Sequence, residues 1–232
     1  CDLRQYVSNW SHWVFTGALH MRFLFVALSM LCLSLTAQAE EKRIALLIGN
    51  NDYPASVGRL ANTHNDVSKL KASLQATGFE VITGLDQNKL SMLTAIDNFN
   101  SRVNSEAARG KEVVAFFYYS GHGVSLNRDG QRRNYLLPAK ENITSALTLT
   151  DRGIDLSNVI STFAASKAKA FFVISDACRN ELEVSFTRSV GGGGKGFGTI
   201  PQRPGMLIAF STAAGATAPD DGKFAEILAT QI

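Results

Sequence analysis

Short strand-like runs that alternate with amphipathic stretches are the feature that most constrains the fold of this chain. Five such runs, each bounded by turn residues, are typical of strands buried on both faces: residues 43–49, 79–83, 113–119, 169–175 and 206–210. Apolar side chains near helical spacing predict helices at 65–76, 90–108 and 156–165, and residues 135–138 are expected to be extended. Strands joined by helical crossovers predict an α/β domain whose mostly parallel sheet is covered on both faces.

The amino-terminal part of the chain predicts a secretory signal peptide at residues 21–39. Met21-Arg22 provides a basic start, and the apolar run from Phe23 to Leu35 is short for a bilayer span. The small residues Ala37 and Ala39 then form a cleavage pattern, so we expect cleavage after Ala39 and export to the periplasm or the medium. An uncleaved membrane anchor is the alternative. Residues 1–20 are interpreted as an upstream, non-native or read-through segment.

The remaining part, residues 40–232, is long enough for one domain with its own core. Of the 23 Lys and Arg residues, Arg4 and Arg22 precede this part, and of the 20 acidic residues only Asp2 does, which leaves 21 cations and 19 anions. A net charge of +2 gives no reason to expect nucleic acid as a partner, and a membrane only through an uncleaved signal peptide. The oligomeric state is left open.

Cys178 is the one cysteine after residue 39, so an exported domain of this sequence contains no internal disulfide. A lone thiol is either a small buried apolar group or a reactive group. The charged neighbours Asp176 and Arg179 favour the second reading, because charges beside an inert core cysteine would be costly to bury.

His122 follows another of the strand-like runs, in the sequence Gly121-His122-Gly123. Sites in parallel sheets form at the carboxyl ends of strands, so His122 and Cys178 are expected to meet if their strands are neighbours. An imidazole beside a thiol activates it as a nucleophile. The flanking glycines are expected to allow a tight turn, and the amides of Gly123 and Cys178 to face a developing oxyanion.

Five stretches in this order resemble the caspase and metacaspase family of cysteine peptidases. They are Arg43–Tyr53, Asn65-Asp66, Tyr118–Gly123, Asp176–Asn180 and Ala209–Gly215, and they cover most of residues 43–225. The separation of His122 from Cys178 also suits this family. The resemblance implies a caspase-like three-layer α/β/α fold and a cysteine-type endopeptidase.

The same resemblance implies roles for six residues. His122 would be the general base and acid, Cys178 the nucleophile, and Gly123 part of the oxyanion hole. Asp66, Ser120 and Asp176 would line the pocket for the substrate residue before the cleaved bond. Two carboxylates attract a basic side chain, so we expect cleavage of proteins and peptides after Arg or Lys. Caspases proper have glutamine in place of Asp176, so aspartate specificity is not expected.

Other interpretations stay open from the residues alone. Asp66 suits the first turn of a helix, Asp176 a turn cap, and His122 an ordinary loop histidine. At the level of function, the alternatives are a catalytically silent caspase-like regulatory or binding module and an unrelated cysteine hydrolase acting on small esters or amides.

Two regions depart from a simple caspase-like pattern. The glycine-rich segment 188–198 lacks the strand and helix context of a phosphate-binding loop and is expected to be a surface loop. The carboxyl-terminal part is shorter than the family pattern, so we expect a domain truncated there that lacks its last edge strand. No metal site and no cofactor are expected, because no compact set of oxygen ligands is present, although some metacaspases require calcium.

Overall fold

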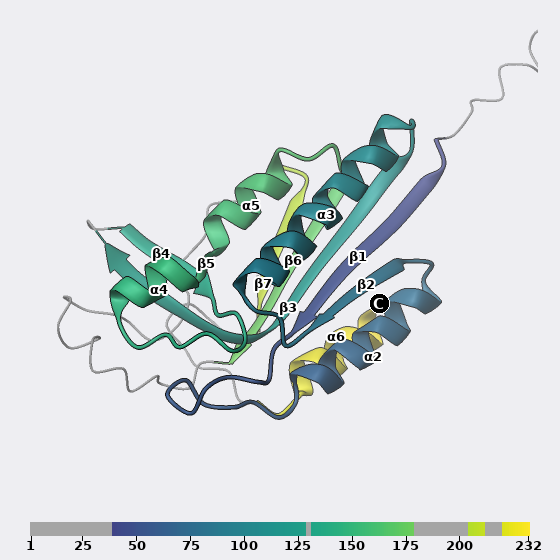
Figure 1. Cartoon of the computed structure of the whole chain (residues 1–232). Coiled ribbons are helices and arrows are strands. Elements are labelled where there is room, and N and C mark those ends of the chain that lie inside the picture. The colour runs from purple at the N-terminus through teal and green to yellow at the C-terminus, as the bar shows by residue number, and fades with distance from the viewer. Residues whose placement is uncertain (1–38, 129–130, 179–203, 212–219) are drawn as a thin grey trace, which may run out of the picture. The chain divides into compact units, whose positions relative to one another are not determined.

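Five parallel strands form the centre of the fold, in the order β2, β1, β3, β6, β7 (Figure 1). The computed structural model describes residues 39–128, 131–178, 204–211 and 220–232, without the side chains of residues 127, 128, 131, 132 and 178. The strands are β1 Glu41–Gly49, β2 Glu80–Leu85, β3 Glu112–Arg128, β6 Ala170–Cys178 and β7 Met206–Phe210. The predicted α/β class and mostly parallel sheet are confirmed.

Helices cover both faces of this sheet, as the layers in Figure 1 show. On one face lie α3 (Lys89–Ala108) and α5 (Leu156–Ala164), and on the other α2 (Thr63–Ala76) and α6 (Lys223–Gln231). This coverage explains why β1 is continuously apolar, since Ile44 to Ile48 are all 0% exposed.

Aromatic rings dominate the core between the sheet and the α3 side. Phe163 of α5 stacks on Phe171 of β6 with ring centroids 4.4 Å apart, and Phe99 of α3 meets both rings edge-on. All three side chains are at most 3% exposed. Burying each contributes roughly 2–3 kcal/mol, which fixes α3 and α5 against the strands that carry the candidate site.

A small antiparallel extension continues the sheet beyond the parallel strands. The second half of β3 pairs with β4 (Gln131–Leu136), which pairs in turn with β5 (Ile154–Asp155). The sequence predicted that the β3 strand ends at Tyr119, and this was wrong by nine residues. The polar continuation of β3, with its two glycines, is a strand because β4 supplies its hydrogen-bond partners.

A further short helix, α4 (Ala146–Arg152), was not anticipated from the sequence. It begins with a capping box in which the Ser145 hydroxyl accepts the Thr148 amide and the Thr148 hydroxyl accepts the Ser145 amide. Seven residues are too few to show a helical period, so the cap is the one local signal for this helix.

The predicted signal peptide, the upstream segment 1–20 and the glycine-rich stretch 188–198 lie outside the described residues, and they stay predictions together with the carboxyl-terminal truncation. Within the described ranges, the helices are either too short or too polar to cross a bilayer.

Candidate active site

The candidate site forms where the middle of β3 runs beside the carboxyl end of β6. The two strands are parallel neighbours, and their register pairs Ser120 with Asp176 and His122 with Cys178. Neighbouring strands lie about 4.8 Å apart, so the backbones of His122 and Cys178 are adjacent. The expectation that these two strands are neighbours is confirmed. Both residues lie within their strands, however, where the sequence analysis had placed them after the strand ends.

The His122 side chain is buried, 1% exposed, and its ring is held on two sides. Its Nε2 lies 2.8 Å from the carbonyl oxygen of Gly58. Since a carbonyl only accepts, Nε2 carries the proton and the basic nitrogen of the neutral ring is Nδ1. The Tyr53 ring packs against the imidazole with the ring centroids 4.6 Å apart. The loop that precedes α2 therefore sets the orientation of this histidine.

Gly121 has a different role from the one expected. The chain does not turn at this residue, because β3 continues through it. A Cβ at position 121 would lie 2.5 Å from the Tyr119 hydroxyl and 2.6 Å from the Tyr53 hydroxyl. Glycine is therefore required by the close approach of two tyrosines, and the prediction of a tight turn was wrong.

Gly123 is the first residue of β3 beyond its ladder with β6. It is paired instead with Leu136 of β4, while its neighbour His122 is the last residue paired with β6. Its backbone thus lies beside the carboxyl end of β6, where an oxyanion-hole amide is expected.

Asp66, Ser120 and Asp176 are brought together from three elements. Asp66 in the first turn of α2 is 3% exposed, and its Oδ2 accepts a hydrogen bond of 3.2 Å from the Ser120 hydroxyl. Asp176 in β6 is 6% exposed and accepts a hydrogen bond of 3.1 Å from Tyr118. Among the side chains that the structure describes, neither carboxylate has a basic partner at hydrogen-bond distance, which is unusual because burying a charge is costly unless it is paired.

The electrostatics of this carboxylate pair follow from burial and mutual repulsion. Burial, and then the charge of Asp176, raise the pKa of Asp66 to about 6, against the hydrogen bond from Ser120. Burial also raises the pKa of Asp176, although hydrogen bonds from Ser211 and Tyr118 oppose the shift. Oδ1 of Asp66 is buried without a hydrogen-bond partner. The pair therefore has an unmet capacity to bind a cation.

The segment leading into α6 adds a third carboxylate that sequence reasoning missed. Asp220 accepts the amide of Ala61 at 2.8 Å, and its charge further raises the pKa values of both Asp66 and Asp176. Gly222 has a φ of +69°, and a Cβ there would lie 3.1 Å from the unpaired Oδ1 of Asp66. No local signal marks the contact of Asp220 with Ala61, which joins residues 159 positions apart in the sequence.

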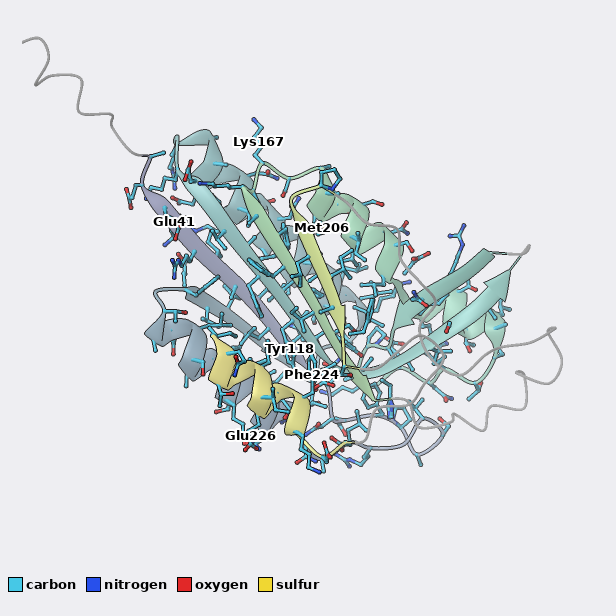
Figure 2. All side chains as sticks on the ribbon, turned by 180° about the vertical axis from the view of Figure 1, so that it is seen from behind. Glu41, Tyr118, Lys167, Met206, Phe224 and Glu226 are labelled. Carbon is cyan, nitrogen blue, oxygen red and sulfur yellow. The ribbon has the colours of Figure 1, made fainter. Side chains whose placement is uncertain are left out.

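Tyr118 joins the apolar core on one face of the sheet to the carboxylate of Asp176. In Figure 2, Tyr118 of β3 lies close to Phe224 of α6, and both belong to the apolar cluster between the sheet and the helices α2 and α6. Tyr118 is fully buried, as expected for a residue that packs within the sheet. Its hydroxyl donates the hydrogen bond to Asp176 that is described above.

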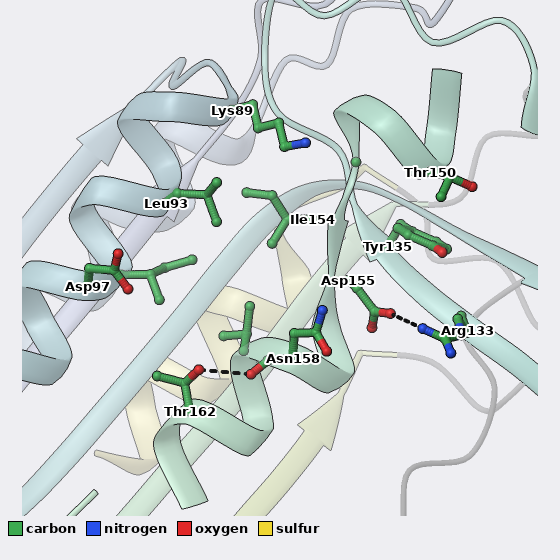
Figure 3. A pocket seen from close by; sticks show the side chains of 13 residues that line it. Lys89, Leu93, Asp97, Arg133, Tyr135, Thr150, Ile154, Asp155, Asn158 and Thr162 are labelled. Carbon is green, nitrogen blue, oxygen red and sulfur yellow. Dashed lines mark hydrogen bonds and ion pairs between the residues drawn. The ribbon is translucent and has the colours of Figure 1, made fainter. Parts of the chain in front are cut away.

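A separate cavity of about 350 Å³ lies on the face of the sheet that α3 and α5 cover. It opens between these two helices and the strands β4 and β5 (Figure 3). Its floor is apolar, with Ile96, Ile154 and Val159, and its rim carries the ion pair of Arg133 and Asp155 at 3.2 Å. None of the described residues that line it is a candidate site residue named from the sequence. Among the side chains the structure describes, no three His, Cys, Asp or Glu residues are grouped as metal ligands.

The fold and the paired strand ends define the class: an α/β protein with a histidine and a cysteine on adjacent strands beside buried carboxylates. The sequence profile of the caspase domain, a peptidase family, matches residues 42–229, and the chain belongs to this family. The resemblance seen in the sequence is thereby confirmed.

The chain is also similar to two known proteins. It is 29% identical over 152 residues to Metacaspase-9 of Arabidopsis thaliana, a match covering 60% of this chain and 44% of the plant protein. The chain thus spans less than half the length of this curated relative. The crystal structure of the Drosophila initiator caspase Dronc is similar in fold, with a TM-score of 0.51 and 9% identity over 85% of this chain and 70% of that one.

Proposed function

We propose that this protein is a cysteine endopeptidase that cleaves protein and peptide substrates after Arg or Lys, with His122 and Cys178 as its catalytic pair. The observation that carries the proposal is the register of two successive same-face pairs, Ser120 with Asp176 and His122 with Cys178. Positions two apart on a strand share a face of the sheet. The proposed specificity pair and the proposed catalytic pair therefore follow one another on the same face of the same two strands.

In the proposed reaction, Nδ1 of His122 takes the proton of the Cys178 thiol as the sulfur attacks the substrate carbonyl carbon. The Gly123 amide stabilises the oxyanion of the tetrahedral intermediate. The carbon–nitrogen bond then breaks as the imidazolium gives its proton to the leaving amine. Water attacks the resulting thioester with His122 again as base, which releases the acid product and the free thiol.

The specificity part of the proposal uses the carboxylates of Asp66 and Asp176. A guanidinium or ammonium group placed between them would partner the unpaired Oδ1 of Asp66 and offset the repulsion of the pair. An acidic substrate side chain would add a third or fourth negative charge beside Asp220 and be rejected.

The direct test compares fluorogenic peptides that differ only in the residue before the cleaved bond. The purified full chain is expected to cleave arginyl and lysyl peptides at least about a hundredfold faster than aspartyl or alanyl peptides. Cleavage is expected to persist in EDTA, since we propose no metal cofactor. Equal rates on all four peptides would contradict the specificity, and the absence of any cleavage would favour a silent binding module.

The raised pKa of Asp66 predicts that binding of a guanidinium compound weakens in acid. The carboxylate must be ionised to bind the cation, so the Kd of agmatine is expected to rise roughly tenfold for each pH unit below about 6. Isothermal titration between pH 4.5 and 8 measures this without involving the catalytic pair. In the matched variant Asp66→Asn, the Kd should be larger, and it should depend less steeply on pH, because only Asp176 is left to titrate in the proposed pocket.

The same substitution is expected to stabilise the protein without ligand. A carboxyl whose pKa is raised by folding gives stability when protonated, which is present below about pH 4 and is lost as the pH rises to about 6. Above pH 6, Asp66→Asn should therefore unfold at a higher urea concentration than the wild type, by of order 1 kcal/mol. A variant less stable than the wild type at pH 7.5 would contradict the strained carboxylate pair.

A further inference from the structure

We infer that Tyr53 is a positioning residue for His122, an inference that rests on the proposed peptidase function. Tyr53 is 3% exposed and contacts His122 through both its ring and its hydroxyl. It lies in the loop between β1 and α2, about 70 residues before the histidine. No feature of the local sequence assigns it a part in the chemistry.

The Tyr53 hydroxyl ties its own loop to the backbone at His122 and at Leu137. It accepts the amide of His122 at 3.0 Å and donates to the carbonyl of Leu137 at 3.0 Å. A hydroxyl has one proton to donate, and the Leu137 carbonyl is an acceptor that can take it. Burial raises the pKa of Tyr53 well above its usual value, so the group stays neutral and acts through geometry.

The carbonyl of His122 is held in a complementary way. It accepts the amide of Leu137 at 3.0 Å and a hydrogen bond of 2.7 Å from the Tyr119 hydroxyl. The hydroxyls of Tyr53 and Tyr119 lie 3.1 Å apart, directly over Gly121. Both peptide groups of His122 are therefore fixed by tyrosines, and the absence of a side chain at position 121 makes the arrangement possible.

The Tyr53 ring restricts the imidazole itself. It lies at a tilt of 55° with its centroid 4.6 Å from that of His122, while Gly58 of the same loop accepts the Nε2 proton. The loop is anchored in turn by Asp86, whose carboxylate accepts the amides of Asn51 and Asp52 at 2.7 and 2.8 Å. One anchored loop thus sets both the ring orientation and the tautomer of the proposed base.

Two substitutions separate the effects of the hydroxyl and of the ring. Tyr53→Phe keeps the ring and removes the backbone hydrogen bonds, whereas Tyr53→Leu removes both. We expect kcat on the arginyl peptide to fall about tenfold in the first variant and about a hundredfold in the second, because misplacing a catalytic group by about 1 Å has effects of this size. KM should change less than about twofold, since Asp66 and Asp176 are untouched.

Tyr135→Phe is the matched control, because Tyr135 is also buried, at 4% exposure, and belongs to the same apolar cluster as Tyr53. It should retain kcat within about twofold. Wild-type kcat in Tyr53→Leu would overturn the inference while leaving the peptidase function intact. Equal losses in Tyr53→Phe and Tyr135→Phe would overturn it too, since general packing would then explain both.

A spectroscopic measurement tests the inference independently of any cleavage. In ¹⁵N NMR spectra of the wild type, neutral His122 should show the tautomer protonated at Nε2, and Tyr53→Leu should show a mixture of the two tautomers. An unchanged tautomer in Tyr53→Leu would contradict the positioning role. If the wild type cleaves no arginyl peptide, the proposed function fails, and this spectrum still decides whether Tyr53 orients the ring.

Discussion

Replacing Cys178 by alanine is expected to lower kcat/KM on arginyl peptides by at least about 10⁴-fold, since removing the nucleophile of a covalent mechanism abolishes its main route. The Cys178 backbone is paired with His122 across β3 and β6, which is the placement such a nucleophile requires. Initial rates on one arginyl peptide, measured with wild type and variant at equal concentration, give the ratio. The fold should be retained, because one sulfur atom is removed.

With both variants prepared so that residues 1–39 are retained, Cys32→Ala is the control, a second thiol-to-methyl change far from the site in the sequence. This variant should cleave at the wild-type rate. Iodoacetamide should inactivate the wild type with alkylation mapped to Cys178 by peptide mass spectrometry, and excess agmatine should slow the reaction. Residual activity above about 1% in Cys178→Ala would mean that another group is the nucleophile.

The five parallel strands could be predicted because the signal for each strand is local. A strand buried on both faces must be apolar throughout, so residues such as Ile44 to Ile48 show it in any short window. Because sites in parallel sheets form at strand ends, the sequence also predicted that His122 and Cys178 would meet if their strands were neighbours. What it could not provide was the register, because hydrogen bonding between strands leaves no trace in either strand alone.

The errors in the predicted fold have a common physical cause. Beyond Tyr119, β3 is polar and contains two glycines, so by composition it resembles a loop. It is a strand because β4, separated from it by two residues, supplies its hydrogen-bond partners. Gly121 was taken for a turn residue for the same reason. Its real constraint comes from the Tyr53 hydroxyl, about 70 positions away.

The candidate site shows the same division between local and distant signals. Asp66, Ser120 and Asp176 were predicted from short motifs. By contrast, Tyr53 and Gly58, which contact His122, and Asp220, which raises the pKa values of Asp66 and Asp176, lie in loops that had no predicted role. The loop between β1 and α2 contacts both halves of the site, with Gly58 on His122 and Ala61 on Asp220. This loop therefore links the geometry of the proposed base to that of the proposed pocket for a basic side chain.

Replacing Asp176 by asparagine is expected to lower kcat/KM on arginyl peptides about a hundredfold, the second largest effect. Removing one charge from a buried ionic contact has typical effects of 2–5 kcal/mol, and the remaining carboxylate of Asp66 keeps the loss near the lower end. Asparagine keeps the shape and an oxygen that accepts the hydrogen bond from Tyr118. The loss should therefore reflect charge rather than misfolding, which a thermal melt can verify.

A citrullyl peptide separates charge from shape, since citrulline is a neutral isostere of arginine. The preference of the wild type for arginine over citrulline should be large, and Asp176→Asn should reduce it mainly by slowing the arginyl peptide.

Asp220→Asn should reduce this preference less, about threefold to tenfold, because Asp220 adds repulsion to the pair without lying between its carboxylates. Glu226→Gln, an equal charge change on the exposed side of α6 where Glu226 pairs with Lys69, should leave it unchanged. If all three variants lowered the preference equally, long-range charge would explain the specificity, and the buried pair of Asp66 and Asp176 would have no special role.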